Sequence, residues 1–421
     1  MSRPRAHLVV TGSELVRGDR TDLNGPWLAR QLLALGFEPA RISIVGDNAD
    51  ELADAIAAAV DADLCITSGG LGPTHDDRTI ELLARAAGVG LVHDPELEEQ
   101  IAAVSRVHAA RSGRPWGDYA PGVRKQATLP AGAYACGLAG TAPAVLLPLP
   151  AGRAAVALPG PPPELQALWP RVVEHPAIAP LRARALVPER RVLRFFGVGE
   201  SAVARTFDAT GGDGGGVETT ICARDFEIHV DIVAAPGAAA AARADEVEHA
   251  LATEHAAFLF SRDERPVEEL VLGMCRARGL TLATAESCTG GMVAQRLTGI
   301  AGSSDVFLGA VVAYANAVKA AQLGVPEALL AEHGAVSEPV ALAMARGVRE
   351  RLGADVAVAV TGVAGPGGGT EAKPVGLVHF AASGPWGEVP FSWSVPADRD
   401  TIRRRAAASA LHLLLDQLSQ S

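Results

Sequence analysis

A serine and a cysteine stand side by side where an apolar run meets two glycines. The segment TLATAESCTGG predicts a strand that ends at Ser287 and a helix that opens with Thr289, Gly290 and Gly291. Unpaired N–H groups at a helix start favour an anion by roughly 0.3–1 kcal/mol, and glycines let a phosphate or an oxyanion approach the backbone. Ser287 is therefore a candidate nucleophile, although capping of the helix by Ser287 or Thr289 would explain the same residues. Cys288 is a rival, because a thiol at a helix start can have a depressed pKa and is intrinsically more nucleophilic.

A serine needs a base before it can attack, and the segment VVAYANAVK offers Tyr314 and Lys319. A tyrosine, or a lysine with a lowered pKa, can take the proton where no histidine triad is present. Such a proton transfer contributes about 10² to 10⁴ in rate. His333 and His379 have no evident acidic partner in the sequence, so a triad is not indicated. The sequence does not rank Lys319 above Tyr314, and strand-edge packing or a solvated helix face would also explain them.

A second glycine-rich loop, TGVAGPGGGTEAKPVG, follows another apolar run. Its N–H groups can wrap a phosphate or a sugar, and Thr361 and Thr370 add hydroxyl donors beside Gly362. A flexible connector would be rich in glycine too. Glu371 and Lys373 set among the glycines favour a functional loop.

Near the N-terminus, the run DLCITSGGLGPTHDDRT predicts a strand followed by Gly69, Gly70 and Gly72, with Asp76 and Asp77 opening a helix. Glycine amides can hold phosphate oxygens while the two carboxylates hold a hard divalent cation. Such a cation would assist cleavage of a phosphoanhydride. Helix capping by the two aspartates explains the spacing equally well.

Three other polar loops also fall at predicted strand ends. They contain Glu14 in VTGSEL, Asp47 with Asn48 in VGDN, and Gly160 in LPGPPPEL. Ligands of open α/β sheets bind at the carboxyl ends of the strands. We therefore expect these loops to border one site.

The elements that position these residues alternate between short apolar runs and helical patterns, which predicts an α/β fold. We expect two three-layer α/β/α domains joined by a small α+β domain. The predicted boundaries are 1–172, 173–262 and 263–421. The charged segment SRDERP at 261–266 is the expected linker before the last domain.

Composition narrows the function classes. A hydrophobic fraction of 48% in 421 residues supports several cores, and a net charge of −11 argues against non-specific nucleic-acid binding. Five scattered cysteines without a CxxC pair favour reduced thiols and a cytoplasmic protein. The N-terminal apolar run is too short for a signal peptide, and no run is long enough to cross a membrane.

Residues 265–418 resemble the CinA C-terminal domain, the nicotinamide mononucleotide deamidase family, through AESCTGG, VVAYANAVK, HGAVSE, AVAVTGVAGPGGGTEAKPVG and DRDTIRRRAA. The resemblance implies hydrolysis of nicotinamide mononucleotide to nicotinic acid mononucleotide and ammonia, with no cofactor. It implies Ser287 as nucleophile and Lys319 and Tyr314 as proton-transferring groups. The residues expected near the substrate are Thr289, Gly290, Gly291, Thr361 and Gly362, with Arg399 and Arg403 as phosphate candidates.

The N-terminal loops resemble the molybdopterin-binding fold in its CinA branch, which is linked to ADP-ribose pyrophosphatase activity with a divalent metal such as Mg²⁺. That resemblance makes Asp47, Asp76 and Asp77 metal or phosphate candidates, and places Glu14 and Asn24 at the border of the site. The family commonly has Asn-Thr-Asn where this chain has Asp-Leu-Asn at 22–24. The hydroxyl at position 23 is therefore lost.

The middle segment LRFFGVGES resembles the KH-like central domain of CinA, but GVGE at 197–200 lacks the basic neighbours that clamp a nucleic-acid backbone. A spacer or dimerising role is expected instead, with a homodimer implied by the family. Three functions stay open: a bifunctional pyridine-nucleotide salvage hydrolase, a molybdopterin-binding factor, and a non-enzymatic partner in competence or DNA repair.

Overall fold

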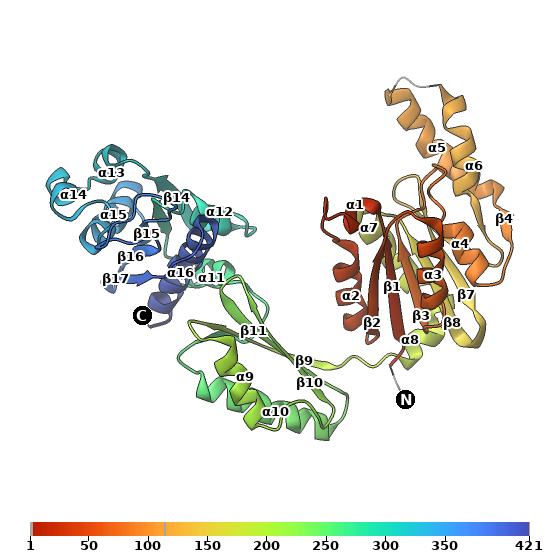
Figure 1. The fold of residues 1–421 in the computed structure, drawn as a ribbon, viewed down its shortest axis with the longest axis horizontal. Helices are drawn as coiled ribbons and strands as arrows, with labels where there is room; N and C mark the ends of the chain where they lie inside the picture. Colours follow the sequence, from red (N-terminus) through yellow and green to blue (C-terminus); the bar gives the residue numbers. More distant parts are fainter. Residues whose placement is uncertain (1–2, 113–114, 421) are drawn as a thin grey trace. The chain divides into compact units, whose positions relative to one another are not determined.

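The computed structural model describes residues 3–112 and 115–420, which form two compact units divided between Glu189 and Arg190 (Figure 1). The first compact unit extends past residue 172, where the sequence placed the end of the first domain. Ile178 and Leu181 follow that position and are buried in the core of the first unit. Their burial keeps the segment to residue 189 with the N-terminal domain.

The N-terminal domain contains a six-stranded sheet in the order β2-β1-β3-β8-β7-β6. β1, β2, β3 and β8 are parallel, as the alternating pattern predicts, whereas β7 and β6 are added antiparallel at one edge. The strands are β1 (Arg5–Thr11), β2 (Glu38–Val45), β3 (Leu64–Ser68), β6 (Tyr134–Leu138), β7 (Pro143–Leu149) and β8 (Arg153–Leu158). A separate pair, β4 (Leu91–His93) and β5 (Thr128–Pro130), is antiparallel.

Helices cover both faces of this sheet, so the three-layer prediction is confirmed. One buried cluster includes Leu52 and Ile56 of α3, and a second on the other face includes Leu28 and Leu32 of α2. The Asn48 side chain accepts two backbone N–H bonds at the start of α3 and so fixes where that helix begins. The helices are α1 (Ser13–Val16), α2 (Asn24–Ala34), α3 (Ala49–Ala59), α4 (Thr79–Ala86), α5 (Pro95–Ser112), α6 (Ala120–Gln126), α7 (Pro162–Val173) and α8 (Ala179–Arg184).

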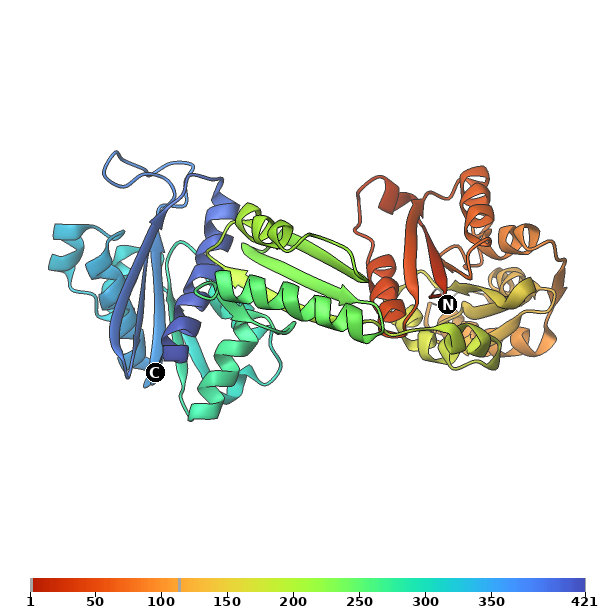
Figure 2. The ribbon, with the colours of Figure 1, turned by 90° about the horizontal axis from the view of Figure 1, so that it is seen from below.

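The middle domain is a four-stranded sheet, in the order β10-β11-β9-β12, with two helices on one face, which is the expected α+β architecture (Figure 2). Alternate residues of β11 are buried against those helices, including Val230 and Ile232. The elements are β9 (Glu189–Phe196), α9 (Glu200–Ala209), β10 (Val217–Arg224), β11 (Glu227–Ala234), α10 (Ala238–Glu254) and β12 (Leu259–Ser261).

The C-terminal domain is a second three-layer fold around a sheet in the order β14-β13-β15-β16-β17. The first three strands are parallel and the last two antiparallel. Separate buried clusters lie on the two faces, one under α15 and the other under α11 and α16. The elements are α11 (Val267–Arg278), β13 (Leu282–Glu286), α12 (Met292–Thr298), β14 (Phe307–Val312), α13 (Asn316–Leu323), α14 (Glu327–His333), α15 (Glu338–Leu352), β15 (Val356–Gly362), β16 (Leu377–Gly384), β17 (Gly387–Ser394) and α16 (Arg399–Gln420).

The last helix, α16, connects two parts of the second unit. Its His412 is buried and hydrogen-bonds Glu227 of the middle domain at 2.9 Å, while Arg403 near its start contacts the loop after β13. Across the described ranges 3–112 and 115–420, no helix has both the length and the apolar character needed to cross a membrane.

Candidate functional site

Ser287 and Lys319 meet at the carboxyl end of the C-terminal sheet. Ser287 follows β13 directly, and its N–H donates to the carbonyl of Val360 in β15 at 2.9 Å. Lys319 lies one turn into α13, and its Nζ is 3.0 Å from Oγ of Ser287. A lysine amine within hydrogen-bond reach of a serine hydroxyl has the geometry of a base and its nucleophile.

The surroundings of Lys319 favour its neutral form. The side chain is 1% exposed and also donates to the carbonyls of Ala313 and Tyr314, at 2.8 and 3.3 Å. None of these three partners is a carboxylate. Burial lowers the pKa of Lys319 from 10.5, an effect that the Cys288 thiol partly opposes. The solvated-surface alternative for Lys319 is therefore wrong.

A buried glutamate takes up the N–H groups that were expected to face an anion. Helix α12 begins at Met292 rather than at Thr289, and the carboxylate of Glu286 accepts from the N–H groups of Gly291, Val293 and Ala294 at 2.8–3.1 Å. The N–H of Gly290 donates to the carbonyl of Ser287. Glu286 therefore satisfies three of the amides that were expected to face a bound anion. Glu286 is not among the residues that the sequence singled out. Its position as an acid just before a predicted helix start could have indicated this role.

Cys288 points into the core instead of the site. The side chain is 4% exposed and belongs to the hydrophobic cluster under α16. Burial raises the pKa of the Cys288 thiol to about 12, so the depressed pKa that its rival role requires is absent. Gly362 lies against this thiol, since a Cβ at that position would come within 3.1 Å of the sulfur.

Two arginines of α16 hold the loops around Ser287. Arg399 donates to the hydroxyl of Tyr314 at 2.8 Å and to the carbonyl of Gly365 at 2.7 Å. Arg403 donates to the carbonyls of Cys288 and Thr289 at 3.0 and 2.9 Å. Arg399 therefore joins two predicted site loops, and Arg403 fixes the loop that carries the serine.

The other predicted residues of this domain differ in exposure. Tyr314 is 60% exposed, and its hydroxyl is paired with Arg399. The Thr361 hydroxyl donates to the carbonyl of Ala335 at 2.8 Å, so it stabilises the loop after β15. Thr289 is fully buried, and its hydroxyl has no hydrogen-bond partner within the described residues.

The loops of the N-terminal domain surround one cavity of about 620 Å³. Thr11 and Ser13 hold Asp47 in its wall: the Thr11 hydroxyl bonds it at 3.4 Å, and the Ser13 N–H at 3.0 Å. The residues of this wall that the sequence predicts are Glu14, Asn24, Asp47, Gly69, Gly70, Gly72, Asp77 and Gly160. These strand-end loops therefore line one common cavity.

Glycine is required where β3 turns into this cavity. Gly69 has φ +99° and Gly70 φ +65°, and a Cβ at either position would collide with Thr11 or Thr79. Asn24 is 6% exposed and donates to Ser68 and to the carbonyl of Gly160 at 2.9 and 2.7 Å. Its Oδ1 is a buried acceptor without a partner in the described chain, which a ligand donor could fill.

Asp76 and Asp77 do not open a helix, because α4 begins at Thr79. Both carboxylates hydrogen-bond the Thr74 hydroxyl, and Asp77 also accepts from the Thr74 N–H at 3.0 Å. Only Asp77 of the two belongs to the cavity wall. Within 3–112 and 115–420, no three His, Cys, Asp or Glu side chains form a group that could hold a metal.

The fold and these two sites define a class: a multidomain α/β protein with a molybdopterin-binding-like domain and a C-terminal domain that carries a buried serine–lysine pair. Residues 7–179 match the probable molybdopterin binding domain, and residues 264–418 match the CinA C-terminal domain. The chain belongs to the CinA family.

Two relatives of similar length support this assignment. The chain is 44% identical over 429 residues to a CinA-like protein of Mycolicibacterium paratuberculosis, which covers 97% of each chain. It is 42% identical over 426 residues to a CinA-like protein of Mycobacterium tuberculosis, covering 99% of this chain and 97% of that one. A crystal structure of a competence/damage inducible protein from Agrobacterium tumefaciens is 43% identical, covers 38% of this chain and 99% of its own, and has a TM-score of 0.35.

Proposed function

We propose that the C-terminal domain is an amidohydrolase that converts nicotinamide mononucleotide to nicotinic acid mononucleotide and ammonia. The observation that carries the proposal is the 3.0 Å contact between Nζ of the buried Lys319 and Oγ of Ser287. Burial disfavours the charged form of Lys319 and so lowers its pKa, and a neutral amine accepts a proton.

The chemistry proceeds in two halves. Lys319 takes the Ser287 hydroxyl proton as Oγ forms a bond to the amide carbon, and the resulting ammonium returns a proton to the departing nitrogen, which leaves as ammonia. Water then attacks the ester carbon, with Lys319 again accepting and returning the proton, so that the acid is released and Ser287 is restored. The transfers from and back to Ser287 use the hydrogen bond between Nζ and Oγ, and the scheme draws on no metal or cofactor.

In this proposal, the loops that Arg399 joins bind the substrate. The guanidinium holds the Tyr314 hydroxyl and the Gly365 carbonyl, so the exposed Tyr314 ring and the glycine loop after β15 have a fixed relation. A mononucleotide phosphate pairs well with a guanidinium, which has further N–H donors. Tyr314 serves in this scheme as a binding residue, with Lys319 as the base.

For the N-terminal domain we propose cleavage of ADP-ribose to AMP and ribose 5-phosphate. The supporting observation is the charge of the 620 Å³ cavity wall, which contains five carboxylates and one arginine: Glu14, Asp22, Asp47, Asp77, Glu164 and Arg20. Such a wall would repel a bare diphosphate, so an anionic substrate requires a cation in the same cavity.

A divalent metal fits this wall in the way that Mg²⁺ usually binds. Mg²⁺ keeps several waters and takes one or two protein carboxylates together with substrate phosphates, so a preformed three-residue cage is not required. Asp47 and Asp77 would hold it, and it would supply charge neutralisation to the phosphoanhydride. Asp76 lies outside the wall and is left without a role.

Two assays on the full chain test both proposals: ammonia release from nicotinamide mononucleotide, and AMP release from ADP-ribose with and without Mg²⁺. Turnover of neither substrate by folded protein would refute both and favour a molybdopterin-binding factor or an interaction protein. An interaction protein in competence or DNA repair further requires that Ser287→Ala leave the cellular phenotype intact. The proposed homodimer is tested by light scattering.

A further inference from the structure

The second unit contains a cavity of about 530 Å³ between the middle domain and the C-terminal domain. The turn between β10 and β11 lines one side, and the starts of α11 and α12 and part of α16 line the other. A volume of this size is typical of sites for small organic ligands. Neither Ser287 nor Lys319 belongs to the wall, so this cavity is separate from the site already described.

An aromatic ring lines the cavity from a turn whose backbone conformation is strained. Arg224 pairs directly with Glu227 in the β10–β11 ladder, so Asp225 and Phe226 form a two-residue hairpin turn. Their φ angles are +50° and +71°, the left-handed values of a turn type that favours glycine at the second position. A bulky residue is unusual there, and strained residues of this kind concentrate at ligand sites. Phe226 thus gives the cavity a flat apolar surface.

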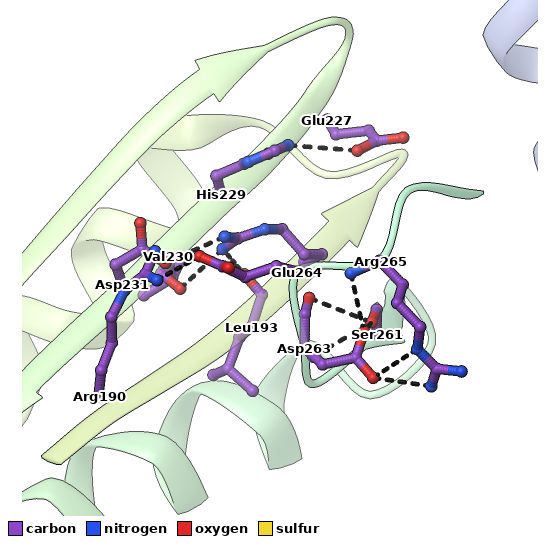
Figure 3. A network of polar contacts seen from close by, with 11 residues as sticks. Arg190, Leu193, Glu227, His229, Val230, Asp231, Ser261, Asp263, Glu264 and Arg265 are labelled. Carbon is purple, nitrogen blue, oxygen red and sulfur yellow. Dashed lines mark hydrogen bonds and ion pairs between the residues drawn. The ribbon is translucent and has the colours of Figure 1, made fainter. Parts of the chain in front are cut away.

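Most charged groups of the wall are already paired. Arg194 bonds Asp231 at 3.0 Å, Arg296 bonds Glu268, and Figure 3 shows Arg265 held by Asp263. Figure 3 also shows Glu227 bonded to His229. These pairs fix the shape of the wall and leave few cations to meet a ligand.

Two arginines of the wall have only weak ion-pair partners among the described residues. Arg224 lies 3.6 Å from Asp225 and Arg404 lies 3.5 Å from Asp400, in pairs whose side chains are all more than half exposed. Such exposed pairs contribute little and exchange readily for a better anion. The guanidinium of Arg404 also stands 6.0 Å from the centre of the Phe226 ring. A phosphate and an aromatic ring could therefore be bound next to each other.

The wall also offers an acceptor. Glu268 is 7% exposed, and while one oxygen pairs with Arg296, the other has no hydrogen-bond partner in the described chain. A sugar hydroxyl or an amino group has the donor that this carboxylate lacks. The cavity wall thus offers a ring for stacking, two guanidinium groups for an anion and a carboxylate that accepts a hydrogen bond. A ligand with an aromatic base, a phosphate and a hydroxyl or amino group would use all three.

We propose that this cavity is a second binding site, which takes a mononucleotide with its base against Phe226 and its phosphate on Arg224 and Arg404. The ligand would contact α12, which follows the Ser287 loop, and α16, which carries Arg399 and Arg403. Binding of the nucleotide here does not depend on whether the C-terminal domain is an amidase.

Calorimetry with the full chain tests the site, with AMP, adenosine and inorganic phosphate as probes. AMP should bind more tightly than either fragment. Phe226→Gly should weaken AMP binding about ten-fold through loss of stacking, and Arg404→Glu should weaken it at least as much. Phe226→Gly should fold well, because glycine adopts φ +71° without strain. Arg351→Glu, at an exposed position on α15, is the matched control and should bind AMP as the unaltered chain does.

Binding of AMP in the N-terminal cavity should be unaffected by both substitutions. The measured quantity is therefore the part of the AMP binding that the substitutions remove. Unchanged AMP affinity in both variants would refute the proposal, as would absence of AMP binding at millimolar concentration. Inorganic phosphate that binds as tightly as AMP would also refute it, by reducing the site to an anion contact.

Discussion

Lys319 and Ser287 come from different elements, yet their reactive atoms lie 3.0 Å apart in a place where water hardly reaches the amine. If Lys319 is the base, Lys319→Met should lower ammonia release by about 10² to 10⁴, since methionine keeps the volume without the amine. Steady-state kinetics with nicotinamide mononucleotide measure the effect. Lys125→Met, in the N-terminal domain, is the control and should retain amidase activity. Near-normal turnover by Lys319→Met would remove lysine from the mechanism.

The pH profile should report the same amine. Only neutral Lys319 can accept the serine proton, so kcat/KM should rise with pH through the pKa of this group. Burial lowers that pKa from 10.5, which places the midpoint of the acid limb below the ordinary lysine value. A limb at or above 10.5 would contradict a buried, desolvated base.

Cys288 should be dispensable for the chemistry. Its raised pKa of about 12 and its burial leave almost no thiolate at neutral pH. Cys288→Ala should therefore keep most of the kcat, with a modest loss of stability from the missing sulfur, while Ser287→Ala should lose it. Assays of ammonia release by the two variants distinguish the two candidate nucleophiles. Loss of activity in Cys288→Ala with activity retained in Ser287→Ala would make the cysteine the nucleophile.

Tyr314 and Lys319 can be separated as bases by Tyr314→Phe. The Tyr314 hydroxyl accepts from Arg399, so its removal should disturb substrate binding and raise KM several-fold while kcat falls by no more than about three-fold. A loss of about 10² in kcat with little change in KM would instead indicate proton transfer by the tyrosine.

Glu286 should contribute to the stability of the second unit. Its carboxylate accepts three backbone N–H groups at the start of α12, so Glu286→Ala should leave these buried and partly buried donors unpaired, at roughly 1–3 kcal/mol for a buried group left unsatisfied. Thermal melting of the full chain should show an early transition of the second unit. Glu286→Gln, which keeps one acceptor oxygen, should be intermediate, and a variant as stable as the unaltered chain would show that these bonds are unimportant.

Much of the architecture follows from local patterns. The apolar run predicted as a strand in TLATAES appears as β13, and the apolar run before the second glycine-rich loop appears as β15, because burial on both faces of a parallel sheet selects continuous apolar segments. The helix boundaries follow less closely: α12 begins three residues after Thr289, and α4 begins three residues after Asp76, where the sequence pattern placed the two helix starts. Contacts from elsewhere in the fold cap or hold the intervening loops, and a sequence pattern does not contain those contacts.

The sequence by itself determined the family, the alternation of elements and the identity of the strand-end loops, since these depend on residue type and spacing along the chain. Only the tertiary structure decided that Lys319 rather than Tyr314 faces Ser287, that Glu286 occupies the start of α12, and that Asp77 but not Asp76 enters the N-terminal cavity. Each of these depends on where a side chain points after distant elements pack. Distances, burial and the resulting pKa shifts arise only in the folded chain.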